Sequence, residues 1–324
     1  MVKNASSLIE ALKAATHSEH AATAFLEINR WPNGAVCPRC EGKRVYQMGS
    51  RSGDRNVNAR WRCRDCAASR GLRPAMFTVR TGTVMEETRL PLRVWVFAFW
   101  KACASKKGIS ALQLSREMQI NYRSALFVLR RLRFGLGNDQ GALTGTVELD
   151  ETYVGGKPRK GPEAKRGRGT SKTPVLGMVQ RGGNVHFQVM ERLTADKIGA
   201  VLVERADKSC RVITDEFPAY PKAVKNFKGG HFTVNHAAGE YAKKGTDINS
   251  NTVESVFSLI KRGVMGTFHS VSRKHLPNYL GEFEFRWNTR YVDDGERVSR
   301  AIRQVQGKRL EYRESVDNPP YLVG

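Results

Sequence analysis

Two acidic side chains follow apolar residues in the second half of the chain, one at the centre of an alternating segment and one at the end of an apolar run. Asp150 follows Val147 and Leu149, which alternate with polar residues, and Asp215 follows Val212-Ile213-Thr214. These patterns predict two β-strands that bring both carboxylates to one site. Mg²⁺ and Mn²⁺ are hard ions that prefer oxygen ligands, and a pair of them can activate a nucleophile and stabilise a leaving oxygen in phosphodiester cleavage.

A third acid is expected from a helix, and the segment 251–264 offers Glu254. The apolar residues of this segment recur at helical spacing: Val253, Val256, Phe257, Ile260 and Val264. Glu254 and Lys261 are about two helical turns apart and share the flank beside this stripe. We therefore expect Glu254 to bind a metal ion and Lys261 to contact a phosphate.

Three other residues are alternatives near this site. Asn251 lies one turn before Glu254 and is the second candidate for the third ligand, although a carboxylate binds a hard dication better than an amide does. His236 lies between the second and third acids, where it could orient the substrate or be an ordinary polar loop histidine. Glu151 follows Asp150, but alternation along a strand points it to the opposite face, which argues against a ligand role.

Four cysteines form a second group with metal-ligand spacing. Cys37 and Cys40 make one CxxC knuckle, Cys63 and Cys66 make another, and 22 residues lie between the knuckles. This spacing predicts a zinc ribbon in which four thiolates hold one structural Zn²⁺ in a closed site. Paired knuckles fit metal binding in a reducing compartment better than disulfides. The remaining cysteines, Cys103 and Cys210, have no partner motif and are expected to be small core residues.

The charge of the chain points to a polyanionic partner. It has 54 Lys and Arg against 31 Asp and Glu, a net charge of +23. Nucleic acid is the expected partner, although a ribosomal or chromatin protein could carry the same charge. Many basic residues surround the cysteines, where they predict either DNA contact or protein docking: Arg39, Lys43, Arg44, Arg51, Arg55, Arg60, Arg62, Arg64, Arg70 and Arg73.

The segment that begins at Gly108 predicts a helix-turn-helix with its turn at 119–121. Its expected shared core is Leu112, Ile120, Ala125 and Leu129. Asn121 would cap the second helix, and the end that enters the DNA major groove would carry Tyr122, Arg123 and Ser124. An ordinary helical hairpin is the alternative.

A basic loop is expected between the first two strands, from 155 to 173. It is predicted either to contact DNA phosphates or to be a solvated linker, and its candidate DNA-binding residues are Lys157, Lys160, Lys165, Arg166 and Arg168. The loop would interrupt a run of strands at 146–154, 174–180, 184–190 and 211–214. Helices are expected at 194–206, 217–225 and 250–264.

No export or membrane segment is expected. The first thirty residues have no unbroken apolar core, and the apolar stretch 92–104 is short and contains Arg93 and Lys101. We therefore expect a cytoplasmic protein, associated with the nucleoid when it is bound to DNA.

Together these motifs resemble the bacterial insertion-sequence transposases that join a zinc ribbon to a DDE domain, the ISXO-like group. The resemblance covers nearly the whole chain and rests on the cysteine knuckles, Thr81-Gly-Thr83, Pro91-Leu-Arg-Val-Trp95, Val147-Glu-Leu-Asp-Glu-Thr-Tyr-Val-Gly-Gly156, Asn251-Thr-Val-Glu254 and Ser258-Leu-Ile-Lys-Arg262. It implies an enzyme that cuts and joins DNA with two Mg²⁺ or Mn²⁺ held by Asp150, Asp215 and Glu254. Lys261 matches the basic residue that follows the Glu, and related sequences with an Asn as third ligand keep Asn251 open.

The resemblance also implies a multidomain α+β fold. The expected regions are an N-terminal helical segment at 1–32, a zinc ribbon at 33–83, a helix-turn-helix region at 84–140, a ribonuclease-H-like α/β catalytic domain with a mixed sheet at 141–290, and a C-terminal tail at 291–324. Double-stranded DNA, as terminal repeats and target, is the expected partner, with a homo-oligomer on the DNA. A DNA-binding regulator without catalysis, or a nuclease without strand transfer, would share many of these features.

Overall fold

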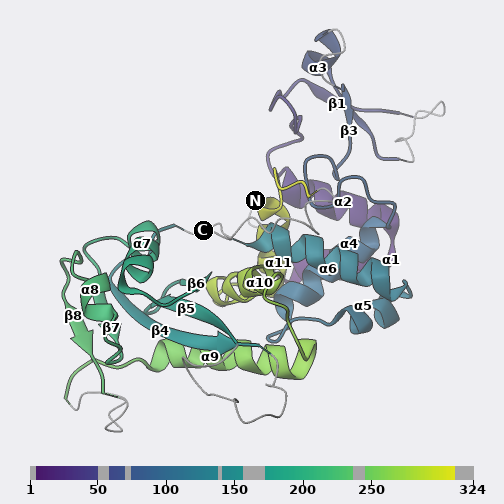
Figure 1. Ribbon diagram of the computed structural model, residues 1–324. Helices are drawn as coiled ribbons and strands as arrows, with labels where there is room; N and C mark the ends of the chain where they lie inside the picture. Colours follow the sequence, from purple (N-terminus) through teal and green to yellow (C-terminus); the bar gives the residue numbers. More distant parts are fainter. Residues whose placement is uncertain are drawn as a thin grey trace. The chain divides into compact units, whose positions relative to one another are not determined.

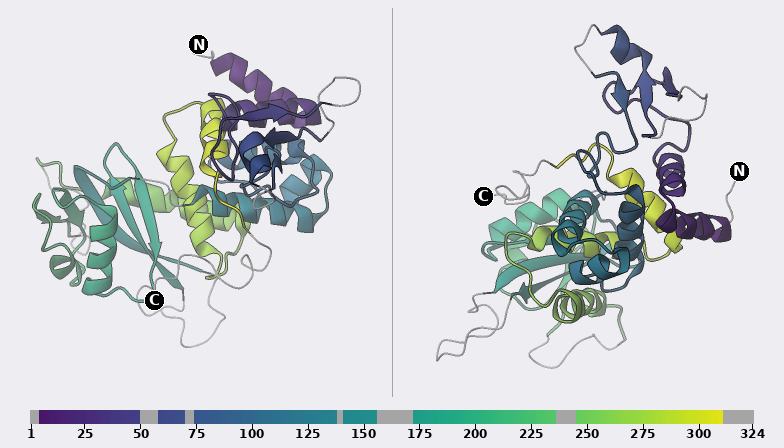
Figure 2. Two further views of the ribbon diagram at one scale, coloured as in Figure 1. Left: turned by 90° about the horizontal axis from the view of Figure 1, so that it is seen from above. Right: turned by 90° about the vertical axis from the view of Figure 1, so that its right-hand side faces the viewer.

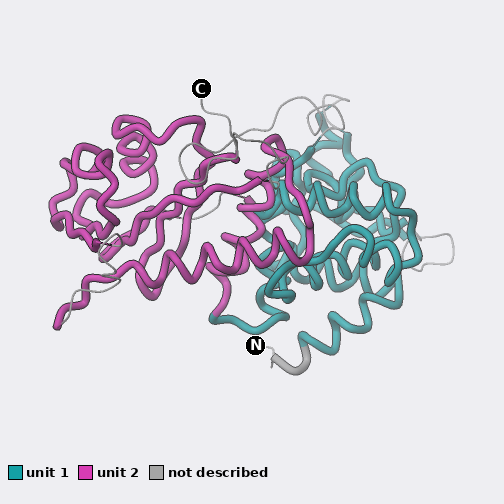
Figure 3. Tube along the Cα trace, turned by 60° about the horizontal axis from the view of Figure 1, so that its bottom comes forward, with its two compact units in different colours: residues 1–136, 291–318 teal, residues 137–290, 319–324 magenta. Residues whose placement is uncertain are grey.

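This computed structural model describes residues 5–49, 58–69, 74–137, 141–155, 172–235 and 245–310. The chain forms two compact units (Figure 3). Unit 1 comprises residues 1–136 and 291–318, and unit 2 comprises residues 137–290 and 319–324. None of the helices within the described ranges has both the length and the apolar character that crossing a bilayer demands.

Unit 1 is built around apolar helices. Ser18 lies between the first two helices of the chain. It caps the second of these helices, because its hydroxyl accepts a hydrogen bond from the Ala21 N–H. The third of these helices is fully buried along Val94, Trp95 and Phe99. The three helices are α1 (Ala5–His17), α2 (Glu19–Arg30) and α4 (Leu92–Ala104).

The cysteine-rich module of unit 1 is a small antiparallel sheet with one short helix. Its elements are β1 (Val45–Gln47), β2 (Trp61–Cys63), α3 (Arg64–Ala68) and β3 (Met76–Phe77), with β2 in the middle of the sheet. The indole of Trp61 donates a hydrogen bond to Glu27 of α2, and Trp31 packs edge-on against Phe77 at 5.9 Å. The module is thus attached to the end of α2 through aromatic side chains.

A helix pair with a tight turn follows α4. Helices α5 (Ala111–Met118) and α6 (Tyr122–Leu136) are joined through Gln119, which has a left-handed φ of 52°. The carboxamide of Asn121 accepts a hydrogen bond from the Ser124 N–H at 2.7 Å, as expected for a cap. The predicted core residue Leu112 is wrong, because its side chain is 48% exposed and Leu114 is buried instead.

The C-terminal segment is not a tail throughout its length. Residues Asp294–Gln304 form helix α11, which belongs to unit 1. Its buried face consists of Val298, Ala301 and Ile302, and it packs against α4 and α2. The prediction of a tail at 291–324 is therefore wrong for this helix, because its apolar stripe is narrow within a strongly charged sequence.

Unit 2 contains a five-stranded mixed sheet in the order β6-β5-β4-β7-β8. Strand β5 pairs antiparallel with both β4 and β6, whereas β7 pairs parallel with β4 and β8 pairs parallel with β7. This is the ribonuclease-H-like arrangement that the resemblance implies. The strands are β4 (Thr146–Val154), β5 (Thr173–Gln180), β6 (Val185–Val189), β7 (Arg211–Thr214) and β8 (His231–Thr233).

The two faces of the sheet carry different helices (Figures 1 and 2). On one face Val147 and Leu149 of β4 pack with α7 (Ala195–Arg205) and α8 (Tyr220–Ala223). On the other face Val154 packs in a cluster with α9 (Asn251–Gly263) and α10 (Leu276–Asn288), and a π-helical turn, η2 (Val264–Phe268), follows α9. Alternate residues of β4 therefore point to different helix layers.

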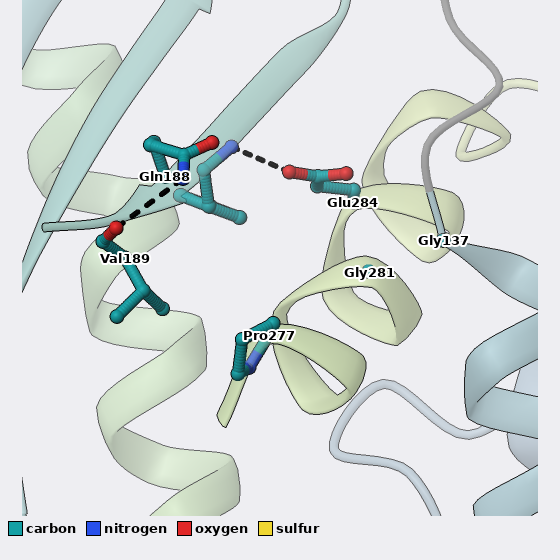
Figure 4. A pocket seen from close by; sticks show the side chains of 7 residues that line it. Gly137, Gln188, Val189, Pro277, Gly281 and Glu284 are labelled. Carbon is teal, nitrogen blue, oxygen red and sulfur yellow. Dashed lines mark hydrogen bonds between the residues drawn. The ribbon is translucent and has the colours of Figure 1, made fainter. Parts of the chain in front are cut away.

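The edge strand β6 is covered by polar side chains of α10. Glu284 accepts a hydrogen bond from the Phe187 N–H, and Asn288 both accepts from the Val185 N–H and donates to the Val185 carbonyl. Figure 4 shows Glu284 pointing from its helix to the strand, beside a cavity of about 20 Å³. Burial raises the pKa of Glu284 to about 8. The helix thus satisfies backbone groups that another strand would otherwise pair.

Candidate active site and metal centre

Asp150 and Asp215 lie on neighbouring strands at the point where the shorter strand ends. Strands β4 and β7 pair in parallel, with Glu148 opposite Ile213. The same register places Asp150 opposite Asp215, just beyond the end of β7. Carboxylate oxygens of Asp150, Glu151 and Asp215 all lie within 4.8 Å of one another. The structure thus brings together the two acids that the strand patterns predicted to meet, and adds Glu151.

Glu151 belongs to this cluster although strand alternation argued against it. The direction of the side chain follows the alternation, because Glu151 accepts a hydrogen bond at 2.6 Å from the hydroxyl of Tyr220, on the α8 side of the sheet. Beyond Glu148, however, β4 has no paired residue in β7. The long side chain of Glu151 can therefore reach the site past the part of β4 that does not pair with β7. The alternation of side chains along the strand does not by itself exclude Glu151 from the cluster.

Glu254 lies in the first turn of α9, half-buried, and its carboxylate accepts a hydrogen bond at 3.3 Å from the buried Ser250 hydroxyl. Its charge contributes to raising the pKa of Asp150, but Glu254 is not part of the group of carboxylates that lie within 4.8 Å of one another. Asn251 is the exposed first residue of α9, and Lys261 is exposed two turns after Glu254. All three candidates therefore share the helix that packs on the Asp150 face of the sheet.

Glu148 fixes the start of α9 and was missed by the sequence analysis. Its side chain is fully buried, and it accepts hydrogen bonds from the backbone N–H groups of Thr252 and Val253 at 2.8 and 3.0 Å. The Thr252 hydroxyl donates to it as well, at 2.8 Å. A carboxylate at this position satisfies unpaired donors of the helix N-terminus and interacts favourably with its dipole.

Arg181 completes this contact. It forms an ion pair with Glu148 at 2.7 Å and donates hydrogen bonds to the carbonyls of Asp247 and Asn249. The segment that leads into α9 and the helix start are thus held to β4, two residues from Asp150. The sequence did contain a sign of this role. Glu148 lies between Val147 and Leu149 in an alternating strand, so its side chain had to point to the opposite face of the sheet, which α9 covers.

The electrostatics of the acid cluster favour protonation without a cation. Burial, followed by the charges of Glu151, Asp215 and Glu254, raises the pKa of Asp150 to about 7, against a lowering by the Glu151 N–H. Asp215 is oriented by the Phe217 N–H, which donates to its carboxylate at 3.0 Å. An all-oxygen set with this much unbalanced negative charge suits Mg²⁺ or Mn²⁺, so the residues fit the cations that the family implies.

The four cysteine sulfurs also lie within 4.8 Å of one another. Cys37 and Cys66 Sγ atoms are 3.7 Å apart, and those of Cys40 and Cys63 are 3.6 Å apart. A tetrahedral zinc site with Zn–S bonds of about 2.3 Å requires sulfur separations of roughly 3.8 Å. Burial, together with hydrogen bonding of its protonated thiol to the other three cysteine sulfurs, raises the pKa of Cys66 to about 12. The arrangement fits one closed, structural zinc ion.

The remaining candidate residues fall into two groups. Tyr122, Arg123 and Ser124 lie at the N-terminus of α6, where Tyr122 and Arg123 are exposed. His236 and the loop residues Lys157, Lys160, Lys165, Arg166 and Arg168 lie outside the described residues. Near the acids, the sequence analysis also missed His231, whose Nε2 is 2.9 Å from the Thr214 hydroxyl.

Some basic residues around the cysteines are engaged within their own module. Arg39 donates hydrogen bonds to the carbonyls of Pro74 and Met76, and Arg44 forms an ion pair with Asp65. These two side chains stabilise the fold of the module. Both unclustered cysteines, Cys103 and Cys210, are fully buried, which confirms that they are core residues.

Comparison with known proteins identifies two domains. Residues 142–288 match the model of an ISXO2-like transposase domain, and residues 17–69 match that of a transposase zinc-ribbon domain. A protein from the transposable element ISH50 of Halobacterium salinarum is 32% identical over 282 residues, which cover 83% of this chain and 90% of that protein.

Two solved structures of a transposase are also similar over part of the chain. The Mos1 transposase paired-end complex with the left transposon end has 15% identity and a TM-score of 0.29, and covers 66% of this chain and 79% of that chain. The mariner Mos1 paired-end complex with Mg has 12% identity, the same coverage and a TM-score of 0.30. Family membership comes from the sequence matches and not from these superpositions. The chain belongs to the family of transposases that combine a zinc ribbon with an ISXO2-like DDE transposase domain.

Proposed function

We propose that this transposase binds the ends of its insertion sequence, cuts them, and joins the resulting 3′ hydroxyl ends to target DNA. The observation that carries the proposal is the convergence of Asp150 and Asp215 from neighbouring strands, to which α9 adds the charge of Glu254. Both reactions displace an oxygen at phosphorus, so one site can perform them in turn without a covalent protein intermediate.

Asp150, Asp215 and Glu254 are proposed to hold the two divalent cations. Bound in this position, the cations would activate the attacking oxygen and stabilise the leaving oxygen. Tyr220 orients Glu151, and Glu148 orients the start of α9, so that the carboxylates are held in place before the cations bind. Lys261 is proposed to contact a DNA phosphate, because it is an exposed cation on the helix that carries Glu254.

Double-stranded DNA is the proposed partner. The net charge of +23 supports binding to a polyanion, and the exposed Tyr122 and Arg123 support end recognition by the N-terminus of α6. Two ends must be cut and joined together in transposition. We therefore propose that at least two copies of the chain act on the DNA, each with its own acid cluster.

The test is an assay with candidate element ends and Mn²⁺ that measures both nicked and joined products. Cutting and joining are expected from the same preparation. Joining should also occur on a precut end, which bypasses hydrolysis. Nicks without any joined product would instead show a nuclease, and DNA binding without either product would show a regulator that has kept the fold and lost catalysis.

A further inference from the structure

A groove of about 930 Å³ lies in unit 1, between α6 and the segment that precedes α4. One wall is the face of α6 that carries Arg123, Phe127 and Arg130, and the other is the segment 87–90 with Arg89. The residues 123, 127 and 130 recur at helical spacing, so they share one side of the helix. The predicted DNA-reading end of α6 is therefore one end of a concave surface.

The groove is held in shape by a buried arginine. Arg131 of α6 donates hydrogen bonds to the carbonyls of Val84 and Glu86 at 3.0 and 2.8 Å, and its guanidinium lies 4.7 Å from the centre of the Phe127 ring. These contacts attach the segment before residue 87 to the helix. The two walls are thus fixed by the fold and do not need a ligand to form.

The charge of the groove is positive. Its acidic residue, Glu87, is neutralised by an ion pair with Arg309 at 2.7 Å. In contrast, Arg89, Arg123 and Arg130 have no carboxylate within ion-pair distance among the residues that the structure describes. Three guanidinium groups therefore remain available to an external anion, in a groove that is also lined by Leu90 and Phe127.

The shape decides which part of a DNA duplex fits. Base edges lie at the bottom of the DNA grooves and are read by protein elements that protrude. A concave protein surface fits the part of the duplex that itself protrudes, which is the sugar-phosphate strand. Phosphates would meet the arginines that line the groove, and the apolar deoxyribose would meet Leu90 and Phe127.

We propose that this groove holds one sugar-phosphate strand of duplex DNA, with Arg89 and Arg130 as phosphate contacts beside the end-reading Tyr122 and Arg123. The inference rests on the proposed function and adds a binding surface to it. Such contacts position a protein on DNA independently of sequence. Arg89 comes from outside the helix-turn-helix, so two separate segments of unit 1 grip the same strand.

The test measures DNA binding by the full-length chain that carries both Arg89→Gln and Arg130→Gln. Three other proteins are measured for comparison. These are the unchanged chain, a charge-matched control with Lys106→Gln and Lys107→Gln, and a charge-retaining variant with Arg89→Lys and Arg130→Lys. Lys106 and Lys107 are exposed in unit 1 and do not line the groove. Binding is measured in Ca²⁺ over a range of salt, on a candidate end and on a shuffled duplex of equal length.

The Arg-to-Gln variant should bind both duplexes about ten-fold more weakly at low salt. Its plot of log affinity against log salt should be shallower by about 1.8, because each phosphate contact contributes about 0.9 to the slope. The slope of the control variant should fall by less than a third as much as that of the Arg-to-Gln variant, and the lysine variant should keep the slope of the unchanged chain. A loss confined to the candidate end would overturn the proposal in favour of base reading, and an equal loss in the control would reduce it to net charge.

Thermal unfolding midpoints that match the unchanged chain establish that the variants are folded. Cutting and joining by the unchanged chain are measured in parallel with Mn²⁺. If the predicted binding pattern appears without catalysis, the proposed reaction fails and the groove stands. If catalysis appears and the Arg-to-Gln variant binds like the unchanged chain, the groove fails alone. No binding of the unchanged chain to either duplex would overturn both.

Discussion

The two clusters of side chains that could hold a metal ion are assembled in different ways. The cysteine cluster takes all its ligands from two knuckles of one small module, and three of its four sulfurs are buried. The acid cluster takes Asp150 and Asp215 from separate strands, and its nearby Glu254 from a helix about a hundred residues along the chain. A complete thiolate set leaves no position for a substrate, whereas half-buried acids at a strand end can share a cation with one. The cysteine cluster is thus a closed site that can only stabilise the fold. The acid cluster is an open site at which a substrate can react.

The largest expected effect comes from removing one acid. Asp150→Ala, Asp215→Ala or Glu254→Ala should each lower cutting and joining by about 1,000-fold, because the cation clamp loses an oxygen ligand. DNA affinity should stay within about two-fold, since it depends on basic surfaces. Product formation and binding are measured for each variant, with the exposed Asp196→Ala as the control.

Asn251→Ala decides the third ligand. If it abolishes joining while Glu254→Ala retains it, the cations are held by two aspartates and an asparagine. Activity in all four variants would contradict the acid site as a whole.

Loss of zinc should be the next largest effect, and it should remain local. Chelation is expected to unfold the cysteine module, because structural zinc contributes roughly 10 kcal/mol or more to such modules. Unit 2 has its own core and should stay folded. Circular dichroism, zinc analysis and end-specific binding are measured before and after chelation. Cooperative unfolding of both units, or purified reduced protein without zinc, would remove the distinction between the two clusters.

Glu148→Gln tests whether metal binding and catalysis at the acid cluster depend on the contact that holds the start of α9. Loss of the charge that pairs with Arg181 should loosen the start of α9 and weaken Mn²⁺ binding and kcat by about ten-fold, with KM for DNA unchanged. Glu284→Gln is the control for burial, since Glu284 is also buried and accepts a backbone N–H, but is not part of the acid cluster. Equal effects of the two changes on Mn²⁺ affinity, measured by calorimetry, would argue for general destabilisation.

The smallest effect is a pH dependence of Mn²⁺ binding at the open site near neutrality. The pKa of Asp150 is raised from its ordinary value of 3.8 to about 7. Mn²⁺ must displace this proton, so its affinity should fall about ten-fold per pH unit below pH 7 and level off above it. Calorimetry at several pH values measures both the affinity and the proton release. A constant affinity between pH 6 and 8 would contradict the raised pKa.

The same shift affects the stability of the metal-free protein. A carboxyl whose pKa is raised by folding favours the folded state in its protonated form, so stability should decline as pH rises from about 4 toward 7. Asp150→Asn removes the ionisable group. The melting temperature of this metal-free variant should therefore exceed that of the unchanged chain at pH 8 and approach it at low pH.

The sequence predicted what is local and missed what depends on packing. The CxxC spacing and the alternation over 146–154 were sufficient to place the cysteine cluster and β4. Strand β8 was missed because three half-buried residues give no periodic signal. Glu148 and Glu151 gained their roles from α9 and Tyr220, which are distant in sequence. Strand patterns thus indicated which acids lie near the site, but not which side chains hold them there.

The cover of β6 by α10 also limits how copies of the chain can associate. An exposed edge strand would allow a neighbouring molecule to add a strand of its own and extend the sheet, a common route to aggregation. Here Glu284 and Asn288 already occupy the N–H groups of Phe187 and Val185. A second copy would have to displace both side chains to pair at this edge. Subunits that assemble on DNA are therefore expected to meet through other surfaces.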